Sequence, residues 1–194
     1  MTDAMTDTPR LLLASASPRR SALLAQIGVA HRIHATEIDE TPLPGEAAAA
    51  LVRRLARGKA LAAVPVAQGL PVLGSDTEVV LDGRVYGKPR DAADGEAMLL
   101  SLAGREHQVL SAVALVLPDG RVLEALSESR VRMRAVSREE ARAYWASGEP
   151  QGKAGAYAIQ GLAAVFISRL EGSFFGVMGL PLFETASLLA EAGL

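Results

Sequence analysis

The stretch Leu11-Leu12-Leu13-Ala14-Ser15-Ala16-Ser17-Pro18-Arg19-Arg20 joins a short apolar run to the start of a helix. Ser17 is a residue type that caps helix N-termini, and Pro18 suits the first helical position, where a missing N–H costs nothing. Leucines at helical spacing follow, and Gly28 predicts the end of the helix. The stretch therefore predicts a strand that leads directly into a helix.

The start of this helix gathers two hydroxyls and two guanidiniums, from Ser15, Ser17, Arg19 and Arg20. Together with the free backbone N–H groups and the positive end of the helix dipole, these groups favour the binding of a phosphate chain. The alternative is an ordinary capped helix with two solvated arginines. A cap explains one serine but not the doubled serines and arginines, so the sequence favours the phosphate site.

The composition indicates a globular protein with a small ligand. A chain of 194 residues with 49% hydrophobic residues can fill the core of one domain, or of one domain with two lobes. The formal charge of −2 argues against binding of a nucleic-acid polymer or an anionic membrane surface. The absence of cysteine excludes disulfides, thiolate zinc sites and a cysteine nucleophile. Any basic function must therefore be concentrated in a pocket.

The first residues do not resemble a targeting sequence. Met1 to Pro9 is polar and lacks the basic start and apolar core of a signal peptide. No apolar run approaches the length needed to cross a bilayer. We therefore expect a flexible leader at residues 1–9, a single domain at residues 10–194, no membrane partner and a cytoplasmic location.

Two charged segments have a structural and a functional interpretation. Asp39-Glu40 ends a predicted strand at residues 31–38, and these carboxylates are either solvated or ligands of a divalent metal beside phosphates. Lys59 lies on the apolar stripe of a predicted helix at residues 46–63. Its ammonium either extends to solvent past the helix end or points inward to an anion. Both alternatives remain open for each segment.

Asp76 lies in a strand pattern at residues 70–81 that the stretch Gly74-Ser75-Asp76-Thr77 interrupts. A carboxylate there is costly to bury without a partner. Asp82-Gly83 predicts a hairpin turn that returns Lys88 to the Asp76 strand. Asp76 either bonds its own turn or belongs to a metal and phosphate site with Thr77, Glu78 and Lys88. The adjacent charges favour the second interpretation.

The remaining segments alternate between helix and strand patterns. Helices are predicted from the Asp91 cap to Leu102, from the Ser137 capping box to Gly148, and from Pro181 to Leu189; strands at 107–117, 121–134 and 162–170; and a glycine-rich loop with Lys153 and Gln160 at 149–161. Such a loop lets the backbone approach a ligand closely. The order predicts an α/β fold with a mixed twisted sheet flanked by helices.

Four motifs in order resemble the Maf family of nucleoside triphosphate pyrophosphatases: Ser15-Ala16-Ser17-Pro18-Arg19-Arg20, Ser75-Asp76-Thr77, Gly87-Lys88-Pro89 and the loop at 153–161. The resemblance covers nearly the whole chain after the leader. It implies hydrolysis of a nucleoside triphosphate to the monophosphate and pyrophosphate with a divalent cation, Mg²⁺ or Mn²⁺. It also implies a cleft between two lobes, similar to the inosine triphosphate pyrophosphatase fold.

The resemblance assigns roles residue by residue. Asp76 matches the catalytic proton acceptor, and with Glu40 it is the expected metal ligand. The expected substrate-binding residues are Ser15, Ser17, Arg19, Arg20, Lys59, Thr77, Lys88, Lys153 and Gln160. Of these, Arg19, Thr77 and Gln160 match positions tied to base selectivity. The form Ala156-Tyr157-Ala158-Ile159-Gln160-Gly161 resembles the branch that acts on dTTP and UTP, rather than the branch that acts on methylated GTP.

Three positions depart from the family pattern. Ser75 replaces an alanine, Gly152 replaces an aspartate, and Ala158 replaces a glycine. These changes leave the reaction class better supported than the substrate preference. The alternatives are a nucleotide-binding regulator of cell division without catalysis, and a pyrophosphatase for another base such as 7-methyl-GTP. A homodimer is compatible with the sequence, which does not determine the oligomeric state.

Overall fold

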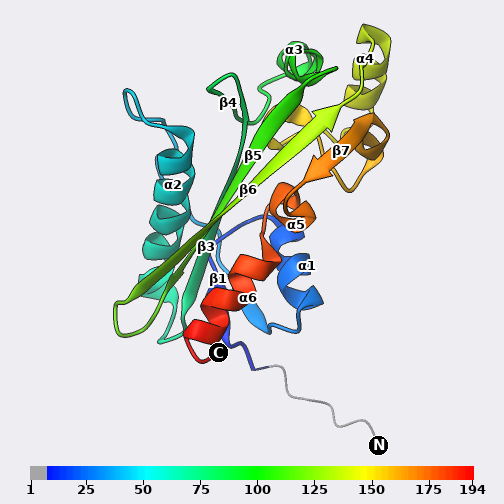
Figure 1. Cartoon of the computed structure of the whole chain (residues 1–194). Coiled ribbons are helices and arrows are strands. Elements are labelled where there is room, and N and C mark those ends of the chain that lie inside the picture. Colours follow the sequence, from blue (N-terminus) through cyan, green and yellow to red (C-terminus); the bar gives the residue numbers. More distant parts are fainter. Residues whose placement is uncertain (1–7) are drawn as a thin grey trace, which may run out of the picture.

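The computed structural model describes residues 8–194 (Figure 1). Its strands are β1 (Leu11–Leu13), β2 (His31–Ile33), β3 (Val72–Leu81), β4 (Arg84–Tyr86), β5 (Glu106–Val116), β6 (Val122–Met133) and β7 (Ile167–Glu171). Its α-helices are α1 (Pro18–Gln26), α2 (Ala48–Ala63), α3 (Ala92–Leu102), α4 (Arg138–Ala146), α5 (Phe174–Met178) and α6 (Leu182–Glu191). Three 3₁₀ turns are η1 (Val64–Val66), η2 (Ala154–Ala156) and η3 (Leu162–Phe166). Most of the expected leader at residues 1–9 lies outside the described residues.

The strands form one mixed sheet in the order β2-β1-β3-β5-β6-β7, with β4 paired to β3. β1 is parallel to both β2 and β3, whereas the long strands β3, β5 and β6 pair antiparallel. The mixed sheet expected from the sequence is therefore confirmed. No helix within residues 8–194 is long and apolar enough to cross a membrane.

Helices cover both faces of the sheet (Figure 1). α2 packs on one face, where its alanines meet β1, β3 and β5. α1 and α6 pack on the other face around Leu11, Leu13 and Leu73. A separate core at the other end of β5 and β6 gathers α3, α4 and the segment that contains Tyr157 and Phe166. The long strands thus connect two packed regions, as the two-lobed expectation requires.

The first strand and helix form as the opening stretch predicts, with one difference. Gly28 has φ +73° just beyond α1, in the left-handed conformation that favours glycine. Ser17 occupies the N-cap position, but its side chain makes no capping hydrogen bond within the described residues. Its backbone N–H instead donates to Ser15 Oγ at 3.1 Å. The prediction of the cap position is confirmed, whereas the prediction of its side-chain role is wrong.

Two predicted strands are shorter than expected. β2 ends at Ile33 rather than residue 38, because its partner β1 is only three residues long. The predicted strand at 162–170 begins as the 3₁₀ turn η3, and β7 starts only at Ile167. Backbone N–H groups of Leu162 and Ala163 donate to the Glu149 carboxylate instead of to a neighbouring strand.

The predicted interruption of β3 is wrong. β3 runs unbroken from Val72 to Leu81 because β5 pairs with it along nearly its whole length, including Ser75 with Val113 and Asp76 with Ala112. The hairpin after it is confirmed, since both Asp82 and Gly83 have positive φ, as the favoured two-residue turn requires. The caps at Asp91 and Ser137 are also confirmed.

Gly74 is the point of closest approach between β3 and α2. A Cβ atom placed there would lie 2.2 Å from the Ala56 carbonyl oxygen and 2.7 Å from the Ala60 nitrogen. These are backbone atoms and cannot rotate away. We expect Gly74→Ala to lower the free energy of unfolding by about 2 to 3 kcal/mol, as over-packing does. Chemical denaturation measures this change.

The matched control is Gly87→Ala, where a Cβ meets no atom within 4 Å among residues 8–194. Its free energy of unfolding should stay close to that of the parent. Equal stability of the two variants would show that α2 can move away from β3 at no cost.

Candidate active site

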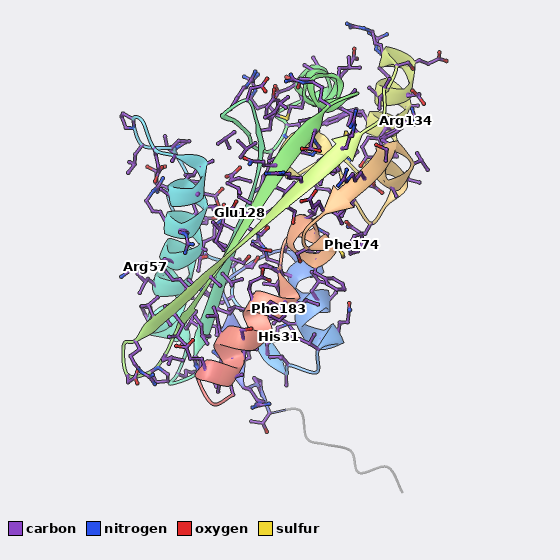
Figure 2. The ribbon with its side chains drawn as sticks, in the orientation of Figure 1. His31, Arg57, Glu128, Arg134, Phe174 and Phe183 are labelled. Atoms are coloured by element: carbon purple, nitrogen blue, oxygen red, sulfur yellow. The ribbon has the colours of Figure 1, made fainter. Side chains whose placement is uncertain are left out.

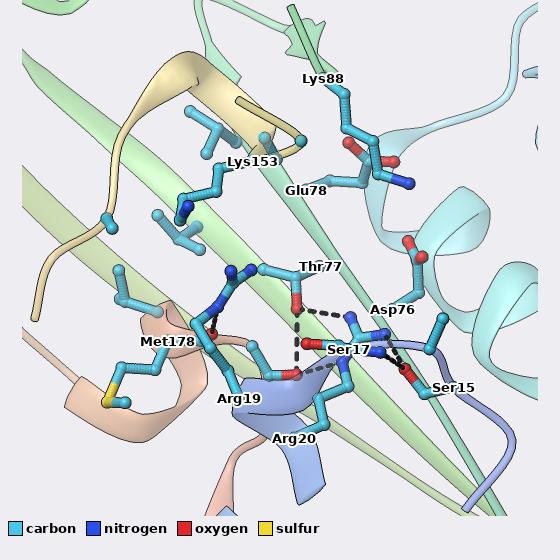
Figure 3. A pocket seen from close by; sticks show the side chains of 18 of the residues that line it. Ser15, Ser17, Arg19, Arg20, Asp76, Thr77, Glu78, Lys88, Lys153 and Met178 are labelled. Carbon is cyan, nitrogen blue, oxygen red and sulfur yellow. Dashed lines mark hydrogen bonds between the residues drawn. The ribbon is translucent and has the colours of Figure 1, made fainter. Parts of the chain in front are cut away.

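A cavity of about 580 Å³ opens between the N-terminal end of α1, the strands β3 and β5, and the glycine-rich loop (Figure 3). Every residue predicted from the sequence to bind substrate or metal lines it: Ser15, Ser17, Arg19, Arg20, Glu40, Lys59, Asp76, Thr77, Lys88, Lys153 and Gln160. These residues come from both halves of the chain. The fold therefore brings the four sequence motifs to one place.

The alternation of β3 gives the cavity two chemically different walls. Gly74, Asp76 and Glu78 share the face toward α2, because side chains two residues apart lie on the same side of a strand. Ser75 and Thr77 point to the other face, where both hydroxyls lie within hydrogen-bond distance of the Gly179 carbonyl oxygen. One strand thus presents carboxylates to α2 and hydroxyls to the segment that follows α5.

Lys59 joins two carboxylates at the bottom of the cavity. Its Nζ lies 2.6 Å from Asp76 Oδ1 and 2.7 Å from Glu40 Oε1. Lys59 and Asp76 are 8% and 6% exposed, so both charges are buried. The ammonium therefore points inward and does not extend to solvent. Asp76 bonds this ammonium rather than its own turn, and its Oδ2 has no hydrogen-bond partner within residues 8–194.

Glu78 lies two residues along the same face of β3. Burial and the neighbouring Asp76 carboxylate raise the pKa of Glu78 to about 8. Burial thus favours the protonated form of Glu78 at neutral pH. Asp76, ion-paired with Lys59, lines the same cavity.

The two arginines of α1 are fixed by backbone carbonyls from the far end of the chain. Arg20 Nε donates to the Gly179 oxygen at 2.8 Å, and Arg19 Nε donates to the Met178 oxygen at 3.3 Å (Figure 3). Arg20 Nη1 also donates to Ser15 Oγ at 3.3 Å. Burial lowers the pKa of both guanidiniums, because a buried charge loses its hydration. An anion in the cavity would compensate this loss.

Thr77 is held from behind by Ser111, which the sequence patterns did not single out. The Thr77 and Ser111 hydroxyl oxygens lie 2.8 Å apart, and Ser111 Oγ donates to the Gly176 carbonyl oxygen at 2.6 Å. Because that carbonyl takes the Ser111 proton, Thr77 is the donor in the bond between the hydroxyls. Ser111 appeared as one polar residue in an apolar strand, so only the strand register could reveal it.

The glycine-rich loop closes the cavity opposite α1. Gly152, Gly155 and Ala156 have φ of +68°, +66° and +57°. Gly152, which departs from the family pattern, therefore has a backbone conformation that favours glycine. Ala158 has a negative φ, so the alanine there introduces no backbone strain. Gln160 lies exposed at the cavity wall, with Tyr157 buried deeper.

His107 on β5 and Tyr144 on α4 support this loop. Tyr157 bonds His107 Nε2 through its hydroxyl at 2.8 Å, and burial lowers the His107 pKa to about 4. His107 is therefore neutral at physiological pH. Tyr144 donates to the Glu149 carboxylate at 2.7 Å. The capping box predicted α4, but its sequence alone could not show that Tyr144 reaches the loop.

The buried oxygen donors fit a hard divalent cation only in part. Asp76 Oδ2 and Glu78 Oε2 are buried carboxylate oxygens without hydrogen-bond partners in the described chain. Carboxylate oxygens are the ligands that Mg²⁺ and Mn²⁺ prefer. No group of three or more His, Cys, Asp or Glu side chains within residues 8–194 converges as a complete cage. Phosphate oxygens of a substrate would therefore have to complete the coordination.

Two solved structures match part of this chain. A nucleoside-triphosphatase, a dITP/XTP pyrophosphatase from Mycobacterium abscessus, matches 65% of this chain and 74% of its own, with 21% identity and a TM-score of 0.40. The Ham1 protein of Staphylococcus aureus matches 63% of this chain and 71% of its own, with 16% identity and a TM-score of 0.44.

Similarity in sequence is much stronger. A dTTP/UTP pyrophosphatase from Bordetella pertussis is 53% identical over 197 residues, covering 97% of this chain and 95% of the relative. A protein of the same name from Methylococcus capsulatus is 52% identical over 186 residues, covering 95% and 92%. The family model described as Maf-like protein matches residues 10–192. The chain therefore belongs to the Maf-like protein family.

Proposed function

We propose that this protein hydrolyses dTTP and UTP to the nucleoside monophosphate and pyrophosphate. The observation that carries the proposal is the buried Lys59–Asp76 pair at the bottom of a cavity whose walls hold Arg19, Arg20 and Lys88. A carboxylate beside several cations is the arrangement needed to bind phosphates and deprotonate water. The close relatives named dTTP/UTP pyrophosphatase support the same substrate class.

The cations of the cavity would bind the triphosphate. The Nε atoms of Arg19 and Arg20 are engaged by carbonyl oxygens, which leaves further guanidinium N–H groups for phosphate oxygens. Lys88 and Lys153 face the same space from the loops opposite α1. The N-terminal N–H groups of α1 add the positive end of a helix dipole. The product pyrophosphate keeps most of these contacts, whereas a monophosphate keeps few.

The reaction needs one proton transfer and one bond exchange. Water attacks the α-phosphorus, the bond from that phosphorus to the bridging oxygen breaks, and pyrophosphate leaves. Asp76 accepts the proton of the water on Oδ2, since Oδ1 is held by Lys59 at 2.6 Å. Lys59 thereby orients the base and balances its charge before the reaction.

A divalent cation, Mg²⁺ or Mn²⁺, would be held by Glu40 and Asp76. When bound, it would neutralise charge on the phosphate oxygens. Glu40 is half-exposed and contacts Lys59 through Oε1, so its carboxylate can reorient toward a cation without leaving the cavity.

The base would be selected where Gln160 and Thr77 line the cavity. Gln160 offers one donor and one acceptor, which match the mixed edge of uracil or thymine. Thr77 donates to Ser111 and therefore offers an acceptor to a ligand, which suits the N3–H of the same bases. The competing explanation for Gln160 is that it bonds loop backbone.

We further propose that residues 10–194 form a single domain that acts in the cytoplasm on a small-molecule substrate. A homodimer is compatible with this proposal, and gel filtration with light scattering determines the assembly.

Asp76→Asn should fold and bind nucleotide but lower kcat by about two to four orders of magnitude, the usual contribution of a positioned general base. The measurement is release of pyrophosphate from dTTP at saturating substrate. Glu128→Gln, on β6 away from the cavity (Figure 2), is the control and should keep parent turnover. A folded Asp76→Asn protein with near-parent kcat would remove Asp76 from the role of base.

Arg19→Ala should weaken binding of a non-hydrolysable UTP analogue by about tenfold or more, because charge-assisted hydrogen bonds to phosphate are lost. UMP, which lacks the distal phosphates, should lose less. Calorimetry gives both dissociation constants. Arg57→Ala on the outer side of α2 (Figure 2) should leave them unchanged. Triphosphate binding as tight as in the parent would contradict the phosphate site at α1.

Gln160→Ala should lower kcat/KM for dTTP and UTP more than for GTP, by about tenfold in the ratio, since one polar contact to the base is lost. Steady-state kinetics with dTTP, UTP, CTP and GTP measure the effect. An equal fall for all four substrates would show that Gln160 shapes the loop without reading the base. A parent that prefers GTP would overturn the pyrimidine assignment.

A further inference from the structure

Gln160 lies between two backbone amides that one pair of side chains anchors. Two residues before it, the Ala158 N–H donates to Tyr144 Oη at 3.1 Å. Two residues after it, the Leu162 N–H donates to Glu149 Oε2 at 2.9 Å. The pair is itself connected, because Tyr144 Oη donates to Glu149 Oε1 at 2.7 Å. The segment around Gln160 is therefore fixed on both sides from α4 and the turn behind it.

The Glu149 carboxylate is closely surrounded by hydrogen-bond donors. It also accepts the Ala163 N–H at 3.3 Å, so it receives hydrogen bonds from one hydroxyl and two amides. A Cβ atom on Gly161 would lie 2.0 Å from Glu149 Oε2. A side chain at position 161 would therefore displace the Glu149 carboxylate from its present place. The Lys153 ammonium donates to the Glu149 backbone oxygen and ties the start of the loop to the same residue.

The anchor is charged and its phenol is neutral. Partial burial by itself would raise the Glu149 pKa, but the hydrogen bonds from Tyr144, Leu162 and Ala163 hold that pKa below its usual range. Burial and the adjacent carboxylate raise the Tyr144 pKa. The contacts are therefore charge-assisted, which makes them stronger than bonds between neutral groups. The Tyr144 ring is held in turn edge-to-face against Phe166, with centroids 5.5 Å apart.

Neither anchoring side chain is among the cavity-lining residues of the described chain. Their effect on a ligand must therefore pass through the segment they hold. We propose that Tyr144 and Glu149 are positioning residues for base selection, which hold Gln160 at the place where it reads uracil or thymine. This inference rests on the proposed function, in which Gln160 contacts the base.

A purely structural role would give a different result. If the pair only stabilises the lobe, its loss lowers the melting temperature and the activity on all substrates alike. If it positions Gln160, its loss raises KM and reduces the preference for UTP over GTP, with a smaller effect on kcat, because Asp76 and Lys59 lie on other elements. The ratio of the two kcat/KM values separates these cases.

Glu149→Gln tests the inference at nearly constant volume. A glutamine has one acceptor oxygen and places an NH₂ group against backbone donors, so one anchor becomes unfavourable. We expect the UTP/GTP ratio of kcat/KM to fall about tenfold. The fall should not exceed the one that Gln160→Ala causes. Tyr144→Phe, which keeps the ring, should lower the ratio in the same direction and carries the test if Glu149→Gln fails to fold.

The decisive experiment combines the variants. Glu149→Gln should cause no further loss of selectivity in a Gln160→Ala protein, because residues that act as a unit are not additive. Tyr86→Phe, a buried tyrosine on β4, and Glu128→Gln are the controls and should keep the parent ratio. Melting temperatures of all variants are measured in parallel.

Two results would overturn the inference, and they differ in what else they affect. If Gln160→Ala lowers the UTP/GTP ratio but Glu149→Gln and Tyr144→Phe do not, the anchoring pair is structural only and the proposed base reading stands. If Gln160→Ala itself leaves the ratio unchanged, both this inference and the proposed role of Gln160 fail.

Discussion

The buried ammonium of Lys59, shared between Asp76 and Glu40, is the interaction on which the site depends. A buried charge costs several kcal/mol unless it is closely paired, so these groups must stay together. The pairing is made possible by Gly74, which lets α2 lie directly on β3. Lys59 lies between the two contact residues Ala56 and Ala60, and it reaches the Asp76 carboxylate, two residues from Gly74 along the strand. The packing of α2 on β3 and the ion pair of Lys59 with Asp76 therefore depend on each other.

A second constraint joins the two ends of the chain. The guanidiniums of Arg19 and Arg20 donate to carbonyl oxygens of Met178 and Gly179, at the C-terminal end of the short helix α5. These bonds use part of each guanidinium and direct the rest to the cavity. The hydroxyl of Ser75 contacts the same Gly179 oxygen from the strand. The end of α5 thus holds the cavity-lining arginines and β3 together, although the sequence separates these segments widely.

Features that depend on neighbouring residues could be predicted from the sequence. Contacts between residues that are far apart in the sequence could not. The cap at Ser137, the turn at Asp82-Gly83 and the course of α1 depend on neighbouring residues, so their patterns were readable. The polar residues within β3 look like a break, because the sequence does not show that β5 pairs beside them. The inward direction of Lys59 was one of two open alternatives. Its partners lie on other elements, and only the fold decides between them.

The part of the cavity around Asp76 is built differently from the loop that carries Gln160. In the proposed function the first part performs the reaction and the second recognises the base. Asp76 stands on β3, where it is paired with Ala112 of β5, and it is fixed by a buried charge. The loop with Gln160 has no strand partners and contains Ala156 in a left-handed conformation, so its shape depends on a few side-chain anchors. Substitutions behind that loop can shift the position of Gln160 without moving Asp76. With the roles we propose for Gln160 and Asp76, a fold of this kind could change its base preference while its hydrolytic centre stays the same.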